Sequence, residues 1–347
     1  MKDIRINTGK EYSVIIGKGL LSTVGQELIK LGVSKKVCII TDKNVQKLYL
    51  STVQDNLTQS GFEVYSQVIT GGENSKSGEN FLAICNFLAQ NSFTRTDTVL
   101  ALGGGIVGDL AGFVASAFAR GINLVQMPTT LLSFVDSSVG GKTAINLASG
   151  KNLVGAFYQP NLVLGDLNTL ETLPEREFAC GMAEVIKYAT VFDSQLFETL
   201  EKNDKNDLEE IIYKCITYKK LVVQADEFDN GQRQLLNFGH TLGHAIEKAS
   251  DFTLSHGQAV GLGMKEIVKA SVRAGLCDKN VYSRLENLLN IYGLIGENPY
   301  SLTDLMQTTM VDKKRKGEHI SPVVCNSIGD CKISKMSLTE WKEFILG

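Results

Sequence analysis

The segment Ala101-Leu-Gly-Gly-Gly-Ile-Val-Gly-Asp109 predicts a buried strand, a glycine turn and the start of a helix. It matches the pattern G-x-G-x-x-G through Gly103, Gly105 and Gly108. Glycines in such a turn let the backbone approach a pyrophosphate, and the helix N-terminus offers unpaired N–H groups with a partial positive charge. The motif alone is a weak signal, because it lies far from the first strand-to-helix turn, where a standard Rossmann domain carries it. Asp42, at the end of an earlier strand, is a candidate partner for a ribose.

Strand and helix patterns alternate on both sides of this segment. Short runs rich in β-branched residues predict strands, and apolar residues at helical spacing predict helices between them. The strands are expected at 36–41, 61–65, 96–102 and 124–127, and the helices at 44–59, 79–91 and 106–119. This alternation implies an α/β N-terminal domain with a mostly parallel, Rossmann-like sheet and helices on both faces. Residues 1–7 alternate between charged and apolar types, which predicts an edge strand.

The second half of the chain is predicted to be a mainly α-helical C-terminal domain. Helical patterns follow one another at 176–192, 194–203, 206–226, 237–250, 257–276 and 278–293, and only 320–325 and 331–334 look extended. Pro174 lies where the alternating strand and helix patterns give way to helical patterns. A chain of 347 residues is also long for a single hydrophobic core. We therefore expect two domains, residues 1–170 and 171–347.

The composition is that of an ordinary globular chain, with 43% hydrophobic and 21% charged residues. Its net charge of −3 creates no overall positive field that would attract nucleic acid or an anionic membrane surface. Seven scattered cysteines without a Cys-x-x-Cys pair argue against a disulfide framework and fit a reducing cytoplasm. The N-terminus lacks the apolar core of a signal peptide, and the apolar stretch 98–119 is interpreted as strand, turn and helix rather than as a membrane span.

Three of the four histidines lie close together, at His240, His244 and His256. His240 and His244 are four residues apart, which on a helix places both imidazoles on one face. Spacing alone makes this pair a candidate to chelate a divalent metal, or to combine one ligand with one proton-transfer group. The alternative is a pair of helix-face histidines in a satisfied core or on a solvated surface. Clustering in a histidine-poor chain favours the metal or catalytic site.

The segment Gly181-Met-Ala-Glu-Val-Ile-Lys-Tyr188 places a carboxylate in an otherwise apolar helix. Glu184 and Lys187 are three residues apart, so an ordinary helical ion pair is one interpretation. The other is that Glu184 completes a Glu/His/His zinc set with one open position. Arg233 precedes Asn237 by one helical turn, and both are candidates to face that metal.

Lysines among glycines form a second candidate site, for a phosphorylated ligand. They lie in the segments Pro128-Thr-Thr130, Asp136-Ser-Ser-Val-Gly-Gly-Lys-Thr143 and Gly150-Lys-Asn152. A P-loop needs a glycine where this chain has Asp136, so an NTPase is excluded. A surface loop with solvated lysines is the alternative.

Taken together and in this order, the motifs resemble those of the 3-dehydroquinate synthase family, and the resemblance covers essentially the whole chain. The motifs that carry it are Gly-Gly-Gly-Ile-Val-Gly-Asp, Pro-Thr-Thr-Leu-Leu, Asp-Ser-Ser-Val-Gly-Gly-Lys-Thr, Gly-Lys-Asn-Leu-Val-Gly-Ala-Phe-Tyr-Gln-Pro, Gly-Met-Ala-Glu-Val-Ile-Lys and Asn-Phe-Gly-His-Thr-Leu-Gly-His-Ala. Two departures are minor: Ala144-Ile-Asn146 replaces the Val-Asn of many relatives, and Gln258 stands where Glu is often seen.

The resemblance implies the site residues. Zinc, with Co²⁺ as an alternative, would be held by Glu184, His240 and His256, which leaves His244 as an active-site residue and not a ligand. The NAD site, mainly in residues 1–170, would include Asp42, Glu73, Lys76, Gly105, Asp109, Thr129, Thr130, Lys142, Lys151, Thr169 and Thr172. Substrate contacts would come from Lys142, Asn152, Lys187, Lys219, Arg233, Asn237 and one of Lys313 and Lys314. Arg120 matches an arginine that reaches the substrate phosphate across a homodimer interface.

The resemblance also implies a lyase of the shikimate pathway, which leads to chorismate and the aromatic amino acids. In this reaction 3-deoxy-D-arabino-heptulosonate 7-phosphate becomes 3-dehydroquinate and phosphate by NAD-dependent oxidation, β-elimination, re-reduction and intramolecular aldol closure. The pocket is expected between the two domains. The alternatives are a cyclase acting on sedoheptulose 7-phosphate or a glucose 6-phosphate-like ligand, a polyol dehydrogenase with net NADH production, and a non-catalytic binding protein.

Overall fold

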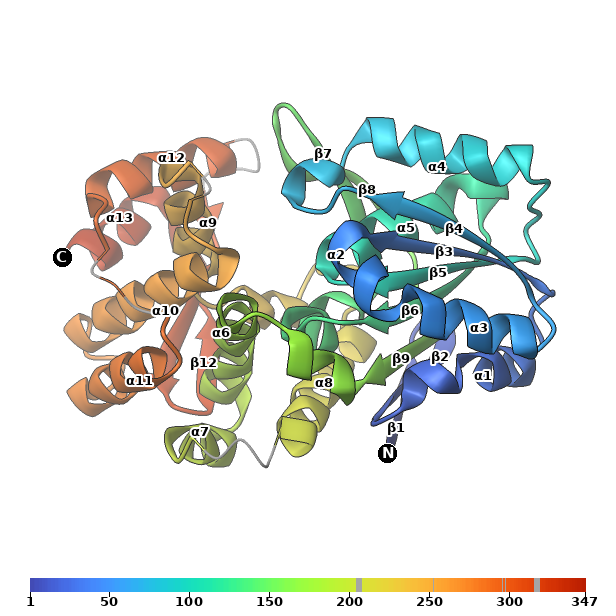
Figure 1. The fold of residues 1–347 in the computed structure, drawn as a ribbon. Helices are drawn as coiled ribbons and strands as arrows, with labels where there is room; N and C mark the ends of the chain where they lie inside the picture. Colours follow the sequence, from blue (N-terminus) through green and yellow to red (C-terminus); the bar gives the residue numbers. More distant parts are fainter. Residues whose placement is uncertain (204–207, 252, 295, 297, 315–318) are drawn as a thin grey trace. The chain divides into compact units, whose positions relative to one another are not determined.

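The computed structural model describes the whole chain except residues 204–207, 252, 295, 297 and 315–318 (Figure 1). The chain divides into two compact units. Unit 1 comprises Met1–Pro174 and Ile212–Glu227, and unit 2 comprises Glu175–Ile211 and Phe228–Gly347. Unit 1 therefore extends past residue 170 and includes the later helical segment 212–227, so no single boundary in the sequence separates the two units.

The core of unit 1 is a seven-stranded sheet. Its spatial order is β1 (Lys2–Asn7), β2 (Glu11–Gly17), β9 (Leu162–Asp166), β6 (Asn123–Pro128), β5 (Thr98–Gly103), β3 (Lys36–Asp42) and β4 (Glu63–Ile69). Only β1 and β2 pair antiparallel, and every other neighbouring pair is parallel. The mostly parallel sheet is thus confirmed, and β1 lies at its edge as predicted. The order of the strands from β3 to β9 is that of a doubly wound sheet, and it reverses direction between β3 and β5, where such sheets bind ligands.

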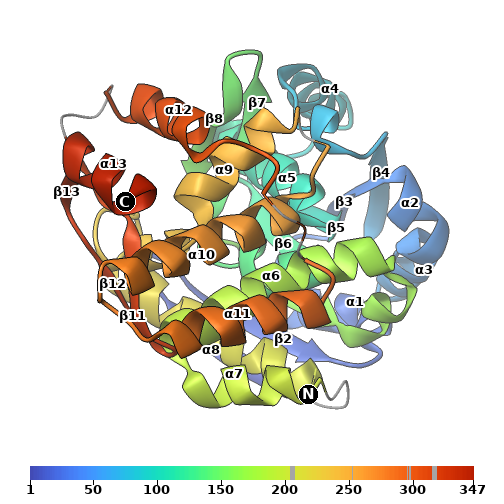
Figure 2. The ribbon, with the colours of Figure 1, turned by 90° about the vertical axis from the view of Figure 1, so that its left-hand side faces the viewer.

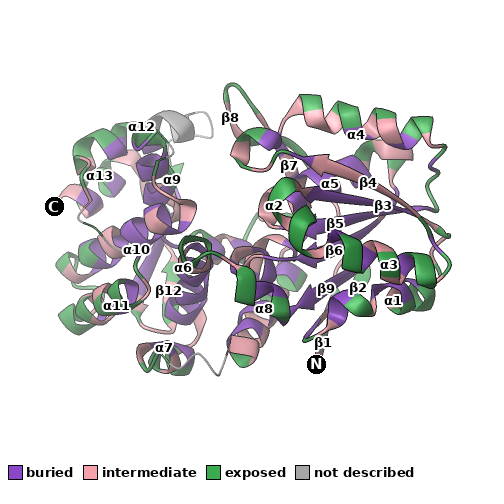
Figure 3. Ribbon diagram, viewed as in Figure 1, coloured by how far each residue is buried: buried purple, intermediate pink, exposed green. Residues whose placement is uncertain are grey.

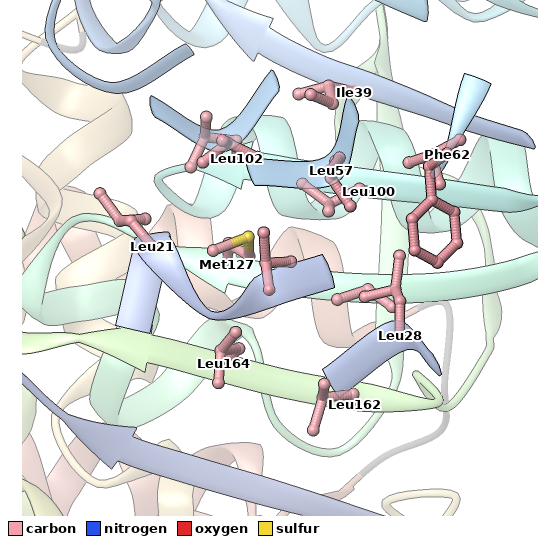
Figure 4. Close-up of a cluster of buried hydrophobic side chains, with 14 of the residues drawn as sticks. Leu21, Leu28, Ile39, Leu57, Phe62, Leu100, Leu102, Met127, Leu162 and Leu164 are labelled. Atoms are coloured by element: carbon pink, nitrogen blue, oxygen red, sulfur yellow. The ribbon is translucent and has the colours of Figure 1, made fainter. Parts of the chain in front are cut away.

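Helices cover both faces of this sheet because successive strand residues point to opposite faces. Val37 and Ile39 of β3 pack with α1 (Val24–Leu31) and α3 (Ser51–Gln59) in the cluster drawn in Figure 4. Cys38 and Ile40 point the other way and pack with α4 (Gly78–Gln90) and α5 (Gly105–Ala117). Burial on both faces explains why β3 and β5 read as continuous apolar runs, and both are buried along nearly their whole length in Figure 3.

Several elements of unit 1 were not predicted. They are β2, β9, α1 and the antiparallel hairpin of β7 (Lys142–Leu147) and β8 (Gly150–Phe157). The helix expected at 44–59 is present as three consecutive segments, α2 (Lys43–Val45), η2 (Gln46–Leu50) and α3. The hairpin contains Lys142 and the segment 150–152, which are part of the predicted site for a phosphorylated ligand.

Unit 2 is mainly helical, as predicted. Its long helices are α6 (Glu175–Phe192), α7 (Ser194–Glu201), α9 (His240–Ala249), α10 (His256–Arg273), α11 (Lys279–Ile291), α12 (Leu302–Lys314) and α13 (Leu338–Leu346). The helix α8 (Leu208–Ala225) spans the change of unit. Figure 2 shows α6, α10 and α11 side by side, and α10 packs on α6, α9 and α11. Short strand pairs, β10 (His319–Ile320) with β13 (Met336–Ser337) and β11 (Val323–Ser327) with β12 (Asp330–Ile333), complete the unit.

Two further observations concern the chain as a whole. Among the described residues no helix combines the length and apolar character needed to cross a membrane, and the stretch 98–119 is divided between β5 and α5 as predicted. All seven cysteines are free thiols.

Candidate functional site

Three helices of unit 2 bring the candidate metal ligands together. Glu184 lies in the middle of α6, and His240 and His256 are the first residues of α9 and α10. The start of α10 is fixed by a capping box in which the Ser255 side chain and Gln258 bond reciprocally. Gly257 lets α10 cross α6 closely, since a Cβ at this position would lie 2.5 Å from the Cα of Cys180. The local sequence thus places both histidines at helix starts beside the carboxylate.

The geometry of this cluster fits a tetrahedral metal. Glu184 Oε1 lies 3.3 Å from His240 Nε2 and 3.4 Å from His256 Nε2. Two ligand atoms of one tetrahedral zinc, each about 2.0–2.2 Å from the ion, lie about 3.4 Å apart. Within the described part of the chain, both oxygens of the buried Glu184 carboxylate lack a well-formed hydrogen bond, although Lys187 Nζ is paired with Oε2. A buried carboxylate that faces two imidazole nitrogens in this way matches the requirements of a divalent cation.

The charged groups of the cluster shift one another's pKa values. Burial by itself would raise the pKa of Glu184, but the positive charges of Lys187 and His240 hold that pKa well below its usual range. Burial lowers the pKa of His256, but the interactions with Glu184 and Glu247 outweigh it and raise the pKa to about 9. Without a metal, the carboxylates therefore favour the protonated form of His256. That proton takes the place of the positive charge that a metal would supply.

The structure separates His244 from this trio. Its ring lies as close to the ring of His240 as the ring of His256 does, 5.4 Å between centroids, so the separation concerns the ligand atoms and not the rings. It falls in a second group of possible ligand atoms, with Glu247 and His256, and not in the group formed by Glu184, His240 and His256. The described residues therefore do not favour chelation of one metal by His240 and His244, which their spacing suggested.

Other predicted substrate residues of unit 2 lie on nearby elements. Arg233 and Asn237 belong to the 3-10 helix η8 (Gln232–Asn237), which packs against α6, and Arg233 is buried whereas Asn237 is exposed. Lys187 is buried on α6 next to Glu184. The side chains of Lys313 and Lys314 lie outside the described part of the structure.

In unit 1, a polar cluster lies beside the N-terminus of α5. Lys76 Nζ donates to Asp109 Oδ2 at 2.6 Å and also to Asn152 Oδ1. Asn152 adopts the left-handed region, with φ of 56°, and its N–H donates to Asn146 Oδ1 at 2.9 Å. Burial raises the pKa of Asp109, and the ammonium of Lys76 opposes that rise. The charges of this cluster are therefore paired within the protein.

The carboxyl ends of the strands supply the other predicted nucleotide contacts. Asp42 ends β3 and its Oδ1 caps α2 by accepting from the N–H groups of Asn44 and Val45. Gly105 starts α5, whose N-terminus has no side-chain cap, after β5. Thr129 follows β6, and within the described residues its buried hydroxyl has no hydrogen-bond partner. Asp42 and Gly105 thus lie at the two strands between which the sheet order reverses.

The remaining predicted contacts of unit 1 are spread over several elements. Glu73 Oε1 accepts a hydrogen bond from Asn146 Nδ2 at 2.7 Å. The hydroxyl of Thr130 donates to Ser133, and that of Thr169 donates to the Asp166 carbonyl. Thr172 shares a hydrogen bond with Tyr49. Lys142 and Lys151 lie on the β7–β8 hairpin, and the buried Lys219 of α8 pairs with Asp136. Arg120 is exposed after α5 and has a left-handed φ of 64°.

Sequence reasoning missed three side chains of these clusters. Asn146 links Glu73 to Asn152, and Asp136 pairs with Lys219. Glu247 lies seven residues after His240 on α9, a spacing that returns to the same helix face and could have identified it.

Comparison with known proteins supplies the context of this geometry. Models described as 3-dehydroquinate synthase N-terminal and C-terminal match residues 66–180 and 181–315. The chain is 44% identical to a 3-dehydroquinate synthase of Clostridium beijerinckii, over 97% of this chain and 99% of the relative. It is 42% identical to one of Streptococcus mutans, over 97% of each chain.

Solved structures with the same fold include two other cyclases. A 2-deoxy-scyllo-inosose synthase complexed with carbaglucose-6-phosphate, NAD⁺ and Co²⁺ matches with a TM-score of 0.89 and 25% identity over 99% of both chains. A 2-epi-5-epi-valiolone synthase from Streptomyces hygroscopicus with NAD⁺ and Zn²⁺ bound matches at 0.87 and 26% identity, over 99% of this chain and 98% of the other. An iron-containing alcohol dehydrogenase, at 0.67 and 15% identity over 96% of each chain, shares the fold alone.

Proposed function

The chain belongs to the 3-dehydroquinate synthase family, and we propose that Glu184, His240 and His256 hold the metal of its reaction. The reaction converts 3-deoxy-D-arabino-heptulosonate 7-phosphate to 3-dehydroquinate and phosphate, with NAD and a divalent metal as cofactors. The single observation that carries the metal assignment is the buried Glu184 carboxylate, which faces two Nε2 atoms at 3.3 and 3.4 Å. Three protein ligands leave one coordination position of a tetrahedral metal open, and a substrate oxygen would bind there.

The protein residues prepare the site for this chemistry. When bound, the metal supplies Lewis-acid polarisation of a substrate oxygen, and NAD supplies reversible hydride acceptance. Glu184 neutralises part of the metal charge, and Lys187 beside it provides a buried cation for the anionic substrate. His244 presents its ring next to that of His240, 5.4 Å between centroids, so its neutral imidazole is positioned to accept a proton from substrate.

We propose that unit 1 binds NAD at the carboxyl ends of β3 and β5. The residues are those implied by the family: Asp42, Glu73, Lys76, Gly105, Asp109, Thr129, Thr130, Lys142, Lys151, Thr169 and Thr172. The uncapped start of α5 provides N–H groups for the pyrophosphate, and Thr129 provides a buried hydroxyl that the described protein residues leave without a partner. Support comes from the location of Asp42 and Gly105 where the sheet order reverses.

We assign the substrate, which carries a carboxylate and a phosphate, to the basic side chains. Unit 1 would contribute Lys142, Lys219 and Asn152, and unit 2 would contribute Lys187, Arg233 and Asn237, in a chain whose net charge is −3. Arg120 would reach the phosphate of a neighbouring subunit in a homodimer. The same proposal places the enzyme in the cytoplasm, with NAD bound mainly by residues 1–170, the N-terminal part of unit 1, and the metal bound by residues within 171–347.

The test of this function is a single reaction containing the purified chain, zinc, NAD⁺ and 3-deoxy-D-arabino-heptulosonate 7-phosphate. Free phosphate and NADH are followed together. We expect phosphate release that requires NAD⁺, without accumulation of NADH, because the hydride is returned in each turnover. Steady NADH production would instead indicate a dehydrogenase, and the absence of both signals from folded, metal-loaded protein would redirect the assignment to other sugar phosphates.

A further inference from the structure

A second buried carboxylate, that of Glu247, lies behind the metal cluster. Glu247 is on α9, the helix that begins with His240, and its residue is 7% exposed. Its Oε2 lies 3.5 Å from His256 Nδ1. The same imidazole presents Nε2 to Glu184 Oε1, at 3.4 Å. The ring of His256 therefore lies between two carboxylates, one for each nitrogen.

The two histidines of the metal cluster are held in the same way but by different acceptors. His240 presents Nε2 to Glu184, and its Nδ1 lies 3.1 Å from the Phe238 carbonyl oxygen. His256 presents Nε2 to Glu184, and its Nδ1 faces a carboxylate. An acceptor at Nδ1 keeps the ring proton there, which leaves the Nε2 lone pair free for a metal. A backbone carbonyl cannot be removed by mutation, but the Glu247 side chain can.

We propose that Glu247 is the positioning residue for His256: it accepts a hydrogen bond from Nδ1–H and thereby aims Nε2 at the metal. This inference rests on the proposed metal site and adds a residue that the family motifs did not identify. Outer carboxylates of this kind raise the basicity of a ligating imidazole and fix its orientation, and their loss typically costs 10–100-fold in metal affinity.

A different role for Glu247 makes a distinct prediction. Glu247, His244 and His256 also present ligand atoms within 4.8 Å of one another, as a second cation would require. His256 would then have to bind one cation through each ring nitrogen. A neutral imidazole with Nε2 on the first metal carries its proton on Nδ1 and has no second lone pair to offer, so we favour the hydrogen-bonded arrangement.

The experiment compares Glu247→Ala and Glu247→Gln with the unchanged chain. Zn²⁺ affinity is measured by competition with a chromogenic chelator, the visible spectrum of the Co²⁺-loaded protein reports ligand geometry, and melting is followed without metal. We expect Glu247→Ala to weaken Zn²⁺ binding 10–100-fold and to alter the Co²⁺ spectrum. Glu247→Gln retains an acceptor oxygen and should restore most of the affinity. Glu286→Gln, which removes a carboxylate that accepts from Lys265 on another helix pair of unit 2, is the matched control and should bind metal normally.

The outcomes separate this inference from the proposed metal site. Zn²⁺ affinity and a Co²⁺ spectrum unchanged in Glu247→Ala, with only the metal-free melting temperature lowered, would reduce Glu247 to a structural role and overturn the inference. Two metals in the unchanged chain and one in Glu247→Ala would overturn it in favour of a second cation site. If the unchanged chain bound no metal at all, the proposed metal site itself would fail.

Discussion

The two polar clusters of the molecule, one in each unit, satisfy their charges in different ways. In unit 2, the buried Glu184 pairs with Lys187 through one oxygen, and its other oxygen faces two imidazole nitrogens, at 3.3 and 3.4 Å. In unit 1, the ammonium of Lys76 already donates to Asp109 and Asn152. A buried carboxylate is costly unless cationic groups surround it, and a cation bound between Glu184 and the two imidazoles would supply a further positive charge. The cluster of unit 2 therefore presents ligand atoms that a metal ion can bind directly. In the cluster of unit 1, the hydrogen bonds of Lys76 would have to be replaced by contacts with NAD when the nucleotide binds.

The largest expected effect comes from Glu184→Gln. The amide removes the negative charge that holds the metal, so we expect loss of stoichiometric zinc and a fall in activity of ~10³-fold or more, since a metal supplies several kcal/mol to the transition state. Metal content and phosphate release measure the result. Glu177→Gln changes an exposed carboxylate on the same helix and should alter neither. Full activity with stoichiometric metal in Glu184→Gln would refute the ligand assignment.

Lys76→Met tests the internally paired cluster of unit 1. It leaves the Asp109 carboxylate without its ammonium partner, and removal of one member of a largely buried pair costs about 3 kcal/mol of unfolding free energy. We expect lower stability and weaker NAD⁺ binding with unchanged metal content, measured by denaturant unfolding and by NAD⁺ titration. Lys43→Met, at an exposed position of α2, serves as the control. Unchanged NAD⁺ affinity in Lys76→Met would remove this lysine from the nucleotide site.

Lys142→Ala should have a smaller effect. The side chain is exposed at the start of β7, so its truncation leaves the core intact. Loss of one charge-assisted hydrogen bond, about 1.5–3 kcal/mol, should raise the KM for substrate or NAD⁺ by about 10–100-fold. Steady-state kinetics with each ligand varied in turn measure this. A variant with normal KM values and normal kcat would mean that the hairpin lysine is merely solvated.

The smallest expected effect concerns Lys10, a half-buried cation whose hydrogen-bond acceptors are neutral. Lys10 Nζ donates to Asn161 Oδ1 at 2.8 Å, and burial lowers the pKa of Lys10 from 10.5 to about 8. Between about pH 8 and 10.5 the unfolded chain binds more protons at this site, so the contribution of Lys10 makes stability rise with pH in that window. Comparison of urea unfolding of the chain and of Lys10→Met across this range should show a shallower rise in the variant. An identical pH dependence would contradict the assigned shift.

Much of the fold was predictable because its core strands have strong local signals. β3 and β5 are buried on both faces, so their apolar runs are continuous, and α4, α6 and α11 show clear helical spacing. The β7–β8 hairpin was missed because its strands are partly exposed and carry lysines and glycines, which are typical of a loop. The return of 212–227 to unit 1 depends on tertiary packing that a helical pattern does not encode.

The candidate site was less predictable from local patterns. Spacing paired His240 with His244, but the described ligand atoms group His240 with Glu184 and His256, from three different helices. That grouping was expected only through the family resemblance. Periodicity identifies which residues share a helix face, and it does not say which faces of distant helices meet.

The most direct test of the contrast between the clusters measures bound metal and bound NAD⁺ in the same three proteins: the unchanged chain, Glu184→Gln and Lys76→Met. We predict that Glu184→Gln loses metal and retains NAD⁺, and that Lys76→Met retains metal and loses NAD⁺ affinity. Retention of metal by Glu184→Gln, or loss of metal in Lys76→Met while the protein remains folded, would contradict the assignment of one ligand to each cluster.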